Sequence, residues 1–152
     1  MVKSLKIITY PNPNLRLKGR PLTQEEIISP ETKQFVNELS KKMLKEDGLG
    51  LAATQVDRQF RVFVINTPDG VQEFINPEIT YRSWLKEKGE EGCLSVPGIF
   101  DYVKRHRKIK IKYFNLLGEQ KILKARKMLA RVIQHEYDHL DGILFIDKLA
   151  KK

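Results

Sequence analysis

Two histidines and a glutamate stand close together near the C-terminal end of the sequence. Residues 135–139 read H-E-Y-D-H, an example of the H-E-x-x-H pattern. On a helix, residues four apart lie on the same face, so His135 and His139 can hold one metal ion between them. Glu136 then lies beside that ion, where it can take a proton from a bound water molecule. Because three fixed letters also arise by chance, two surface histidines without a metal are the simpler alternative.

A metal site that performs catalysis usually has three protein ligands and one open position. The residues after His139 do not supply the third ligand. Phe145 occupies the place of the third histidine of metzincins, and no glutamate follows as in thermolysin-like sites. Asp141 is too close in the sequence to approach the ion from another side. The third ligand is therefore expected from the part of the chain before residue 135.

Cys93 and His106 are the two upstream candidates for the third ligand. His106 lies in the basic run K-R-H-R-K-I-K-I-K at 104–112, which repels a cation. Cys93 is the only cysteine and the better candidate, since a thiolate is a strong, soft ligand. Its neighbours Gly89 and Gly92 allow close approach of the backbone. A lone cysteine buried as a small apolar residue is the alternative.

A third segment of interest is D-G-L-G-L-A-A-T-Q-V at 47–56, which is rich in small residues. Its backbone can line a cleft, and Gln55 can donate a hydrogen bond to an oxyanion that develops during a reaction. A helix end followed by a tight packing contact is the simpler alternative for this segment.

Three segments together resemble the three signature motifs of peptide deformylases, in their order and in their separations. They are G-L-G-L-A-A-T-Q at 48–55, E-G-C-L-S at 91–95 and Q-H-E-Y-D-H at 134–139. The resemblance spans essentially the whole chain, because Y-P-N-P-N-L-R at 10–16, I-N-P-E-I at 75–79 and G-I-L-F-I-D-K-L at 142–149 also look like this family. It implies an enzyme that removes the formyl group from the formylmethionine of nascent peptides and releases formate.

The resemblance also implies a metal centre. Cys93, His135 and His139 are its implied ligands, and the ion is typically Fe(II), with zinc, nickel and cobalt tolerated in purified protein. A hydroxide formed on the metal would attack the formyl carbon, with Glu136 as the catalytic acid and base. Gln55 and the backbone N–H of Leu94 would stabilise the oxyanion.

The same resemblance implies where the peptide binds. Leu49 and Gly50 would line the substrate path and pair with the peptide backbone. Met128 and Val132, together with Leu49, are expected to form an apolar pocket for the methionine side chain. The chain departs from the family pattern at Lys127, where glycine is common. This departure puts a long cationic side chain near the expected entrance of the methionine pocket.

Three alternatives use the same residues differently. A general metallopeptidase would cut internal peptide bonds, but it normally takes Glu or His as its third ligand. A basic ribosome-associated protein with a structural metal is the second alternative. Structural sites usually have four protein ligands, and only three good ones are found here. A catalytically impaired relative, motivated by Lys127 alone, is the third.

The net charge of +9 points to a partner of negative charge. It favours loose electrostatic association with the ribosome, although the densest basic run, 104–112, is also compatible with a solvated strand face. No nucleic-acid-binding motif accompanies the charge, so binding of DNA is not expected. No apolar run spans a membrane and no signal peptide is recognisable, which indicates a cytoplasmic protein, or an organellar one after removal of a transit peptide.

The pattern of the chain predicts an α+β fold. A helix is expected over 29–48, capped by Ser29 and ended by Gly48. Strands are expected at 61–66, 71–80, 108–115 and 120–123, and a second helix runs from about Ala125 to Leu140. The length of 152 residues is that of one domain, so residues 1–152 are expected to form a single catalytic domain. Antiparallel or mixed sheets are expected around the C-terminal helix that carries the H-E-x-x-H pattern.

Overall fold

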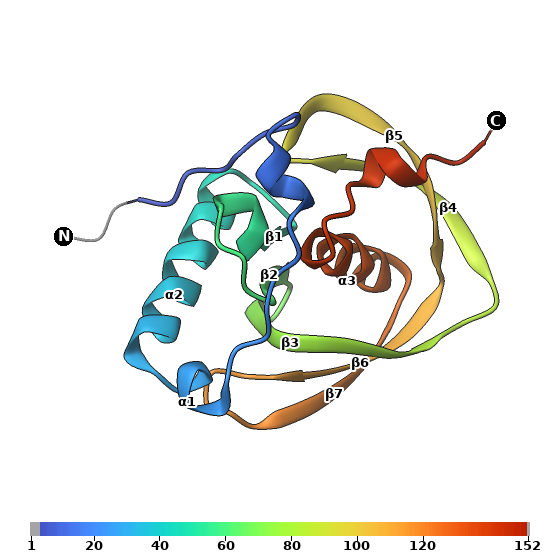
Figure 1. Ribbon diagram of the computed structural model, residues 1–152. Coiled ribbons are helices and arrows are strands. Elements are labelled where there is room, and N and C mark those ends of the chain that lie inside the picture. Colours follow the sequence, from blue (N-terminus) through green and yellow to red (C-terminus); the bar gives the residue numbers. More distant parts are fainter. Residues whose placement is uncertain (1–3, 152) are drawn as a thin grey trace.

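The computed structural model describes residues 4–151, which form the expected α+β fold (Figure 1). Its helices are α1 (Gln24–Ile27), α2 (Pro30–Lys45) and α3 (Lys127–Leu140). Its strands are β1 (Gly50–Ala52), β2 (Val62–Thr67), β3 (Gly70–Arg82), β4 (Lys86–Cys93), β5 (Val96–His106), β6 (Lys108–Phe114) and β7 (Gln120–Arg126). Short 3-10 helices occupy Pro13–Arg16, Ala53–Val56 and Phe145–Lys148. No helix of the described residues is long and apolar enough to cross a membrane.

Helix α2 forms as its sequence predicts. The Ser29 side chain accepts a hydrogen bond from the backbone N–H of Thr32, and Pro30 occupies the first helical position. The helix ends slightly earlier than predicted: Asp47, and not Gly48, adopts the left-handed conformation with φ of 56°. The N–H of Gly48 still donates to the carbonyl of Met43, so the glycine belongs to the cap that stops the helix.

Five strands form one antiparallel sheet in the order β1-β2-β3-β6-β7. The predicted bend near Pro77 is a break in register between Ile75 and Glu78, where β3 pairs with β6. Residues of β6 alternate as predicted, with Ile109 and Ile111 buried. Strand β6 therefore has an apolar inner face and an outer face that carries lysines, whereas both faces of β2 are buried.

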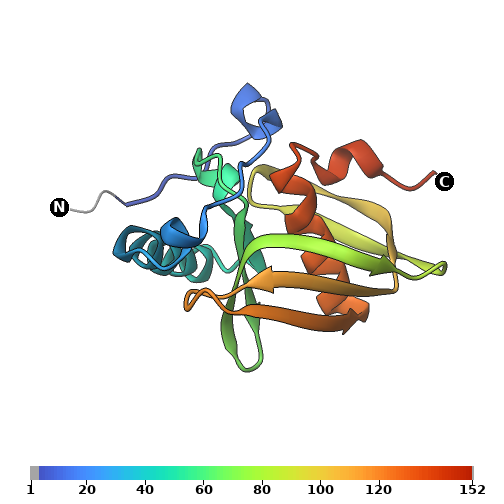
Figure 2. The same cartoon turned by 60° about the horizontal axis from the view of Figure 1, so that its bottom comes forward.

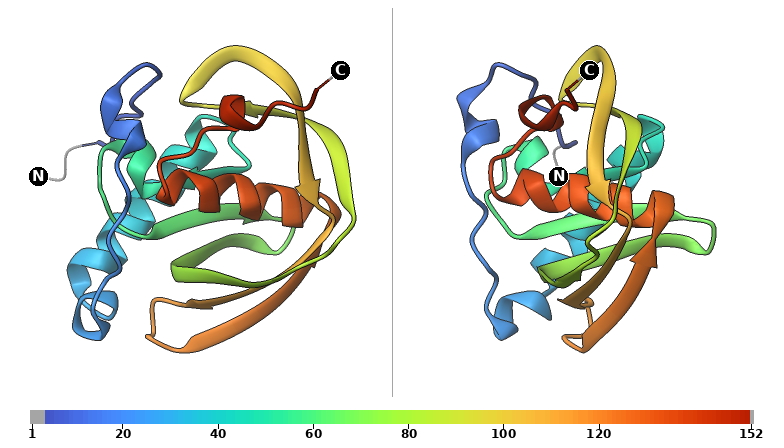
Figure 3. Two further views of the ribbon diagram at one scale, coloured as in Figure 1. Left: turned by 45° about the vertical axis from the view of Figure 1, so that its right-hand side comes forward. Right: turned by 90° about the vertical axis from the view of Figure 1, so that its right-hand side faces the viewer.

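Strands β4 and β5 form a separate antiparallel pair that the sequence pattern did not predict as strands. The basic run at 104–112 is divided between β5 and β6 by a turn at Arg107. The interpretation of this run as a wholly solvated face is wrong at Arg105, which is only 3% exposed. Figure 3 shows α3 lying between this pair of strands and the larger sheet.

Helix α3 packs on the inner face of the larger sheet. Ala130, Ile133 and Leu140 join one buried cluster with Ile109 and Ile111. The helix begins at Lys127 and not at Ala125, because Ala125 and Arg126 pair with β6 as the last residues of β7. Gly142 ends the helix as predicted, with φ of 75° and its N–H donating to the carbonyl of His139.

Lys127 connects β7 to α3 with a left-handed backbone, at φ of 56°. This conformation costs a residue with a side chain about 1–2 kcal/mol, whereas glycine adopts it freely. Because glycine also loses more entropy on folding, we expect Lys127→Gly to raise the free energy of unfolding by about 0.5–1 kcal/mol. Thermal unfolding measures the change, with Lys121→Gly in β7 as a control that should lower the midpoint. A fall of equal size in both variants would contradict the assignment of strain to Lys127.

Candidate metal centre and active site

Cys93, His135 and His139 meet at one point of the fold, although 42 residues separate the first two in the sequence. One donor atom from each side chain lies within 4.8 Å of the others. The Sγ of Cys93 lies 3.3 Å from Nε2 of His139. Both histidines are buried, at 9% and 1% exposure. The structure therefore brings together the three residues that the sequence singled out as ligands. His106 lies elsewhere, with its Nδ1 2.8 Å from the carbonyl oxygen of Ser83.

The backbone around Cys93 places its thiol over α3. Cys93 ends β4 and pairs with Val96 across a tight turn into β5. Glycine at position 92 lets the ring of Phe100 lie against the strand, where an added Cβ would lie 2.5 Å from that ring. Gly89 does the same for the guanidinium of Arg131, which an added Cβ would meet at 2.8 Å. The two glycines thus let β4 pass close to its neighbours and carry Cys93 to the histidines.

Glu91 lies at the centre of a buried ion-pair network that orients His135. Its Oε1 lies 2.8 Å from Nδ1 of His135, which leaves Nε2 to face the cluster. The same carboxylate accepts two hydrogen bonds from Arg105, at 2.9 Å each, and one from Arg131 at 2.7 Å. Arg105 also pairs with Asp138 of α3. A carboxylate behind a histidine is the usual way of fixing the tautomer and ring plane of a metal ligand.

The network sets the protonation of its members. Burial acts to raise the pKa of Glu91, but the hydrogen bonds of His135 and Arg105 outweigh it and hold that pKa well below its usual range. Burial acts to lower the pKa of His135, but contacts with Cys93 and Glu91 raise it to about 10. Binding of a metal would displace this proton. Burial, opposed by the nearby charge of His135, raises the pKa of Glu136 to about 7, which suits a group that exchanges protons near neutral pH.

Replacing Glu91 by glutamine should damage both stability and metal binding. The change leaves two guanidinium groups buried without their shared counter-charge, and loss of one partner of a buried pair costs about 3–5 kcal/mol. Loss of a group that orients a ligand lowers metal affinity by ~10–100-fold. Thermal unfolding and metal titration test this, with the exposed neighbour Glu90→Gln as the control. Equal behaviour of the two variants would contradict the role of Glu91.

Gln55 reaches the same point from the other side. It lies in the 3-10 helix Ala53–Val56 and is 1% exposed. Its Oε1 accepts a hydrogen bond from the backbone N–H of Ala52 at 2.9 Å, so its amide nitrogen must face the cluster. That nitrogen donates to Oγ of Ser95 at 3.1 Å and lies 3.5 Å from Sγ of Cys93. A donor held in this way is positioned for a developing negative charge.

A cavity of about 590 Å³ opens beside the cluster. Its walls come from the segment 46–50, from the β4–β5 turn and from one face of α3. All the residues predicted to bind substrate line it, namely Leu49, Gly50, Met128 and Val132, and so do the two predicted oxyanion donors, Gln55 and Leu94. Lys127 is not among the lining residues, so the expected cation at the pocket entrance is not part of this wall.

Gly50 fixes the distance between the cavity wall and Glu136. An added Cβ at Gly50 would lie 2.6 Å from Oε2 of Glu136, so only glycine leaves the carboxylate in place. The other oxygen, Oε1, is buried and lacks a hydrogen-bond partner among residues 4–151. An unpaired buried carboxylate oxygen at a cavity is suited to a group from outside the chain.

The donor set fits a divalent metal ion. An ion with tetrahedral geometry and ordinary bonds to sulfur and nitrogen places its ligand atoms roughly 3.3–3.6 Å apart. The measured separations, from 3.3 Å to at most 4.8 Å, bracket this range. Three ligands leave one position open, and Glu136 is the next residue after His135 on the same helix. Thiolate and imidazole donors are those of iron and zinc rather than of magnesium or calcium.

Sequence analysis missed the residues behind the ligands. Glu91 belongs to the quoted E-G-C-L-S motif, but no role was predicted for it. Arg105 was interpreted only as part of a basic run, and Arg131 and Ser95 were not singled out. The alternation of β5, in which Val103 and Arg105 point inward, is the signal that would have marked Arg105 as buried.

A Cys-His-His cluster with one open position, a neighbouring glutamate and an adjoining cavity is the arrangement of metal-dependent hydrolases, and this defines the class of protein. Comparison with known proteins is more specific. Residues 4–152 match the family model described as polypeptide deformylase. The peptide deformylase of Helicobacter pylori (strain P12) is 43% identical over 160 residues, which cover 96% of this chain and 86% of the relative.

Solved structures agree with this comparison. The crystal structure of peptide deformylase from Thermotoga maritima superposes with a TM-score of 0.94 at 37% identity and covers 99% of this chain and 100% of that one. A class I type b peptide deformylase from Acinetobacter baumannii, with Met-Ala-Ser bound, gives a TM-score of 0.92 at 33% identity over 98% of this chain and 100% of that one. The chain belongs to the polypeptide deformylase family. Its activity is therefore the metal-dependent removal of the N-formyl group from newly made polypeptides.

Proposed function

We propose that Cys93, His135 and His139 hold the catalytic metal ion of this deformylase, and that the ion is Fe(II), with zinc, nickel or cobalt able to replace it. The observation that carries this proposal is the convergence of the three donors beside Glu136 at the cavity. A divalent ion in this position lowers the pKa of a bound water toward ~7 and so supplies the nucleophile for hydrolysis.

The residues around the cluster transfer the proton and stabilise the oxyanion. Glu136, whose pKa is raised to about 7 by burial, accepts the proton of the attacking water and delivers it to the departing amine nitrogen. The side-chain amide of Gln55 and the backbone N–H of Leu94 donate hydrogen bonds to the carbonyl oxygen as it becomes negative. Because these donors are held in place before the reaction, they lower its barrier without reorganising.

Leu49, Gly50, Met128 and Val132 form the binding surface for the formylmethionine end of the peptide in this proposal. The cavity of about 590 Å³ has room for one methionine side chain beside the cluster. The structure of the Acinetobacter relative contains bound Met-Ala-Ser, which supports a peptide that begins with methionine as the ligand of this family. Apolar pockets discriminate by only ~1–3 kcal/mol per methylene, so norleucine should replace methionine well.

A panel of substrates tests the proposal. The purified, metal-loaded chain is offered a formyl-Met tripeptide, the acetyl-Met form of the same peptide, and casein. We expect formate from the first and little or no hydrolysis of the other two, because a formyl carbon carries only hydrogen and a site that fits closely around it excludes larger acyl groups. Cleavage of casein at a comparable rate would favour the general metallopeptidase.

The thiolate ligand makes the iron enzyme sensitive to air. In air, an Fe(II) ion held by these ligands would generate reactive oxygen species close to Sγ of Cys93, and these oxidants would take the thiolate through sulfenic to sulfinic acid. We expect the activity of the iron form to decay in air within a time during which the nickel or zinc form stays active. Residual formate release and the mass of the Cys93 peptide follow the decay. Equal decay of the iron and nickel forms would contradict this assignment.

We also propose the setting in which the enzyme acts. Residues 1–152 form one catalytic domain, since both sheets pack around α3. The chain works in the cytoplasm, or in an organelle after loss of a transit peptide, where formylated peptides are made. The net charge of +9 supports loose electrostatic association with the ribosome. Sucrose-gradient cosedimentation at low and high salt tests that association.

A further inference from the structure

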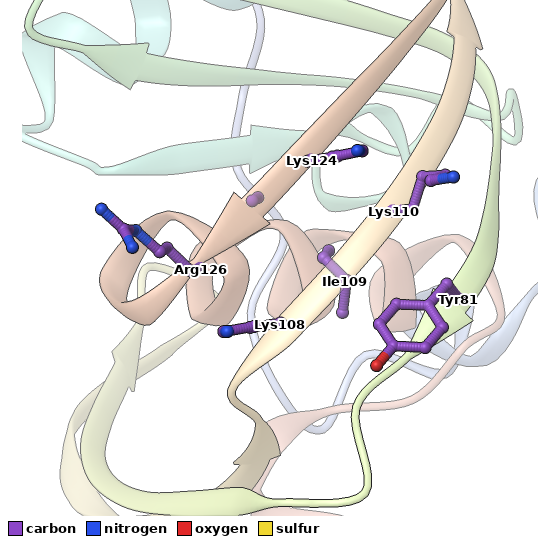
Figure 4. Close-up of a pocket in the computed structure, with 7 residues that line it drawn as sticks. Tyr81, Lys108, Ile109, Lys110, Lys124 and Arg126 are labelled. Carbon is purple, nitrogen blue, oxygen red and sulfur yellow. The ribbon is translucent and has the colours of Figure 1, made fainter.

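The outer face of strands β6 and β7 carries a cluster of basic side chains. Side chains of β6 and β7 alternate between the two faces, and the inner ones pack against α3. Figure 2 shows strands β3, β6 and β7 in front of α3, with no other helix or strand over them. The outer side chains surround a shallow pocket of about 540 Å³ (Figure 4). We call this surface the outer basic face; it comprises Tyr81, Lys108, Lys110, Lys124 and Arg126.

Like charges are placed directly opposite one another on the outer basic face. Lys108 pairs with Arg126 and Lys110 pairs with Lys124 across β6 and β7. Directly opposed like charges destabilise a sheet, so neither pair contributes to the stability of the fold. Lys112, farther along β6, has Glu78 at 3.4 Å, whereas the other four cations form no ion pair with any residue of the range 4–151. Their positive potential is therefore directed outward.

One exposed aromatic residue lines the pocket between these cations, and a second follows it closely in the chain. Tyr81 of β3 lies opposite Lys110, so that Tyr81, Lys110 and Lys124 form a row across three strands. Its side chain is 53% exposed. Trp84 is 95% exposed in the turn that follows β3. The turn is joined to β6 through Ser83, whose N–H donates to the carbonyl of Lys108 and whose Oγ accepts from the N–H of Lys108.

Cations that follow a chain of phosphates, with aromatic rings on which bases stack, are the two components of single-strand nucleic-acid surfaces. An acidic protein would use the lysines but would leave an almost wholly exposed tryptophan without a function. A single-stranded nucleic acid offers flat bases that stack on the aromatic rings and phosphates that pair with the cations.

We propose that the outer basic face binds single-stranded RNA, with phosphates at Lys108, Lys110 and Lys124 and bases stacked on Tyr81 and Trp84. The choice of RNA among polyanions rests on the proposed function, since nascent peptides leave a particle rich in RNA. The face lies on the opposite side of the sheet from α3 and the metal cluster. A bound RNA would therefore hold the enzyme near its substrate without closing the cavity.

Fluorescence anisotropy tests the proposal with the full, metal-loaded chain. The probe is a labelled single-stranded RNA of about 12 nucleotides, within the ~4–16 that such surfaces cover. Two triple variants are compared with wild type: K108Q/K110Q/K124Q on the face, and K33Q/K41Q/K45Q on α2. Both remove three positive charges, and the α2 residues are exposed on a helix that packs against β1 and β2. The pair separates the effect of position from that of net charge.

We expect the face variant to raise the Kd at least ~10-fold and to reduce the slope of log Kd against log salt concentration by roughly 2, because each phosphate contact on a single strand contributes about 0.7. The α2 variant should change the Kd less than ~3-fold. Y81A/W84A should raise the Kd ~10-fold or more without changing the slope, because stacking does not depend on salt. Thermal unfolding should show the face variant at least as stable as wild type, because opposed like charges have been removed.

Three outcomes would overturn the proposal. They are equal weakening by the two triple variants, no salt-dependent binding by wild type, and tighter binding of poly-glutamate than of RNA, which would assign the face to an acidic protein. Formate release is measured on the same preparations, and the face variant should keep the wild-type rate. A wild-type chain that binds RNA through this face but releases no formate would refute the proposed function alone.

Discussion

Glu136→Ala is expected to lower kcat for formate release by ~10²–10⁴-fold while the metal stays bound. The carboxylate is not one of the three converging donors, but it lies beside them in the cavity, with Oε1 unpaired and its pKa raised to about 7. Its loss removes the group that moves a proton between water and the leaving amine. The measurement is single-turnover formate release by anaerobically loaded protein, with the metal content of each sample determined.

Stability separates this loss from unfolding. A buried carboxylate without a partner is costly to hold, so Glu136→Ala and Glu136→Gln should unfold at or above the wild-type temperature. A core substitution usually lowers stability. An unfolding temperature at or above that of wild type would therefore identify Glu136 as a residue kept for catalysis and not for stability. A Glu136→Gln variant that keeps more than about a tenth of the wild-type rate would contradict its role as acid and base.

Cys93→Ala is expected to abolish both metal binding and activity. The thiolate is the ligand on which the choice of iron or zinc depends, and the two histidines alone hold an ion weakly. After anaerobic loading and desalting, elemental analysis should find about one ion per wild-type chain and less than a tenth of that in the variant. The loss of bound metal should also lower the unfolding temperature, because an ion that binds only the folded state stabilises it.

His106→Gln is the matched control for Cys93→Ala. His106 was the other candidate for the third ligand, and the structure directs its Nδ1 to the carbonyl of Ser83 instead. This variant should keep one ion per chain and the wild-type rate. A reversed result, with metal retained in Cys93→Ala and lost in His106→Gln, would show that the wrong residue was chosen.

The elements with strong periodicity were predictable from the sequence. The stripe of Met128, Val132, His135 and His139 places these residues on one face of α3, and three of them line the cavity. The alternation in 108–115 predicted β6 correctly. The start of α3 was not predictable in this way, because Ala125 fits a helix by propensity but is used to extend the pairing with β6.

The parts of the site that belong to the three sequence motifs were predictable. Cys93 could be preferred to His106 on chemical grounds, and the fold confirms that it is Cys93 that lies with the two histidines. The support behind the ligands was not predictable, because Glu91, Arg105 and Asp138 come from three elements and are joined only by tertiary packing. The pairing of Lys110 with Lys124 likewise follows from register, which the turn at 115–119 fixes and composition does not.

The most direct measurement is formate release from a formyl-Met tripeptide as Fe(II) is titrated into metal-free protein without oxygen. We expect activity to rise with added iron and to reach a plateau at one ion per chain, because one cluster of three donors is present in residues 4–151. A folded chain that binds one Fe(II) ion and releases no formate would contradict the assignment of Cys93, His135, His139 and Glu136 to catalysis.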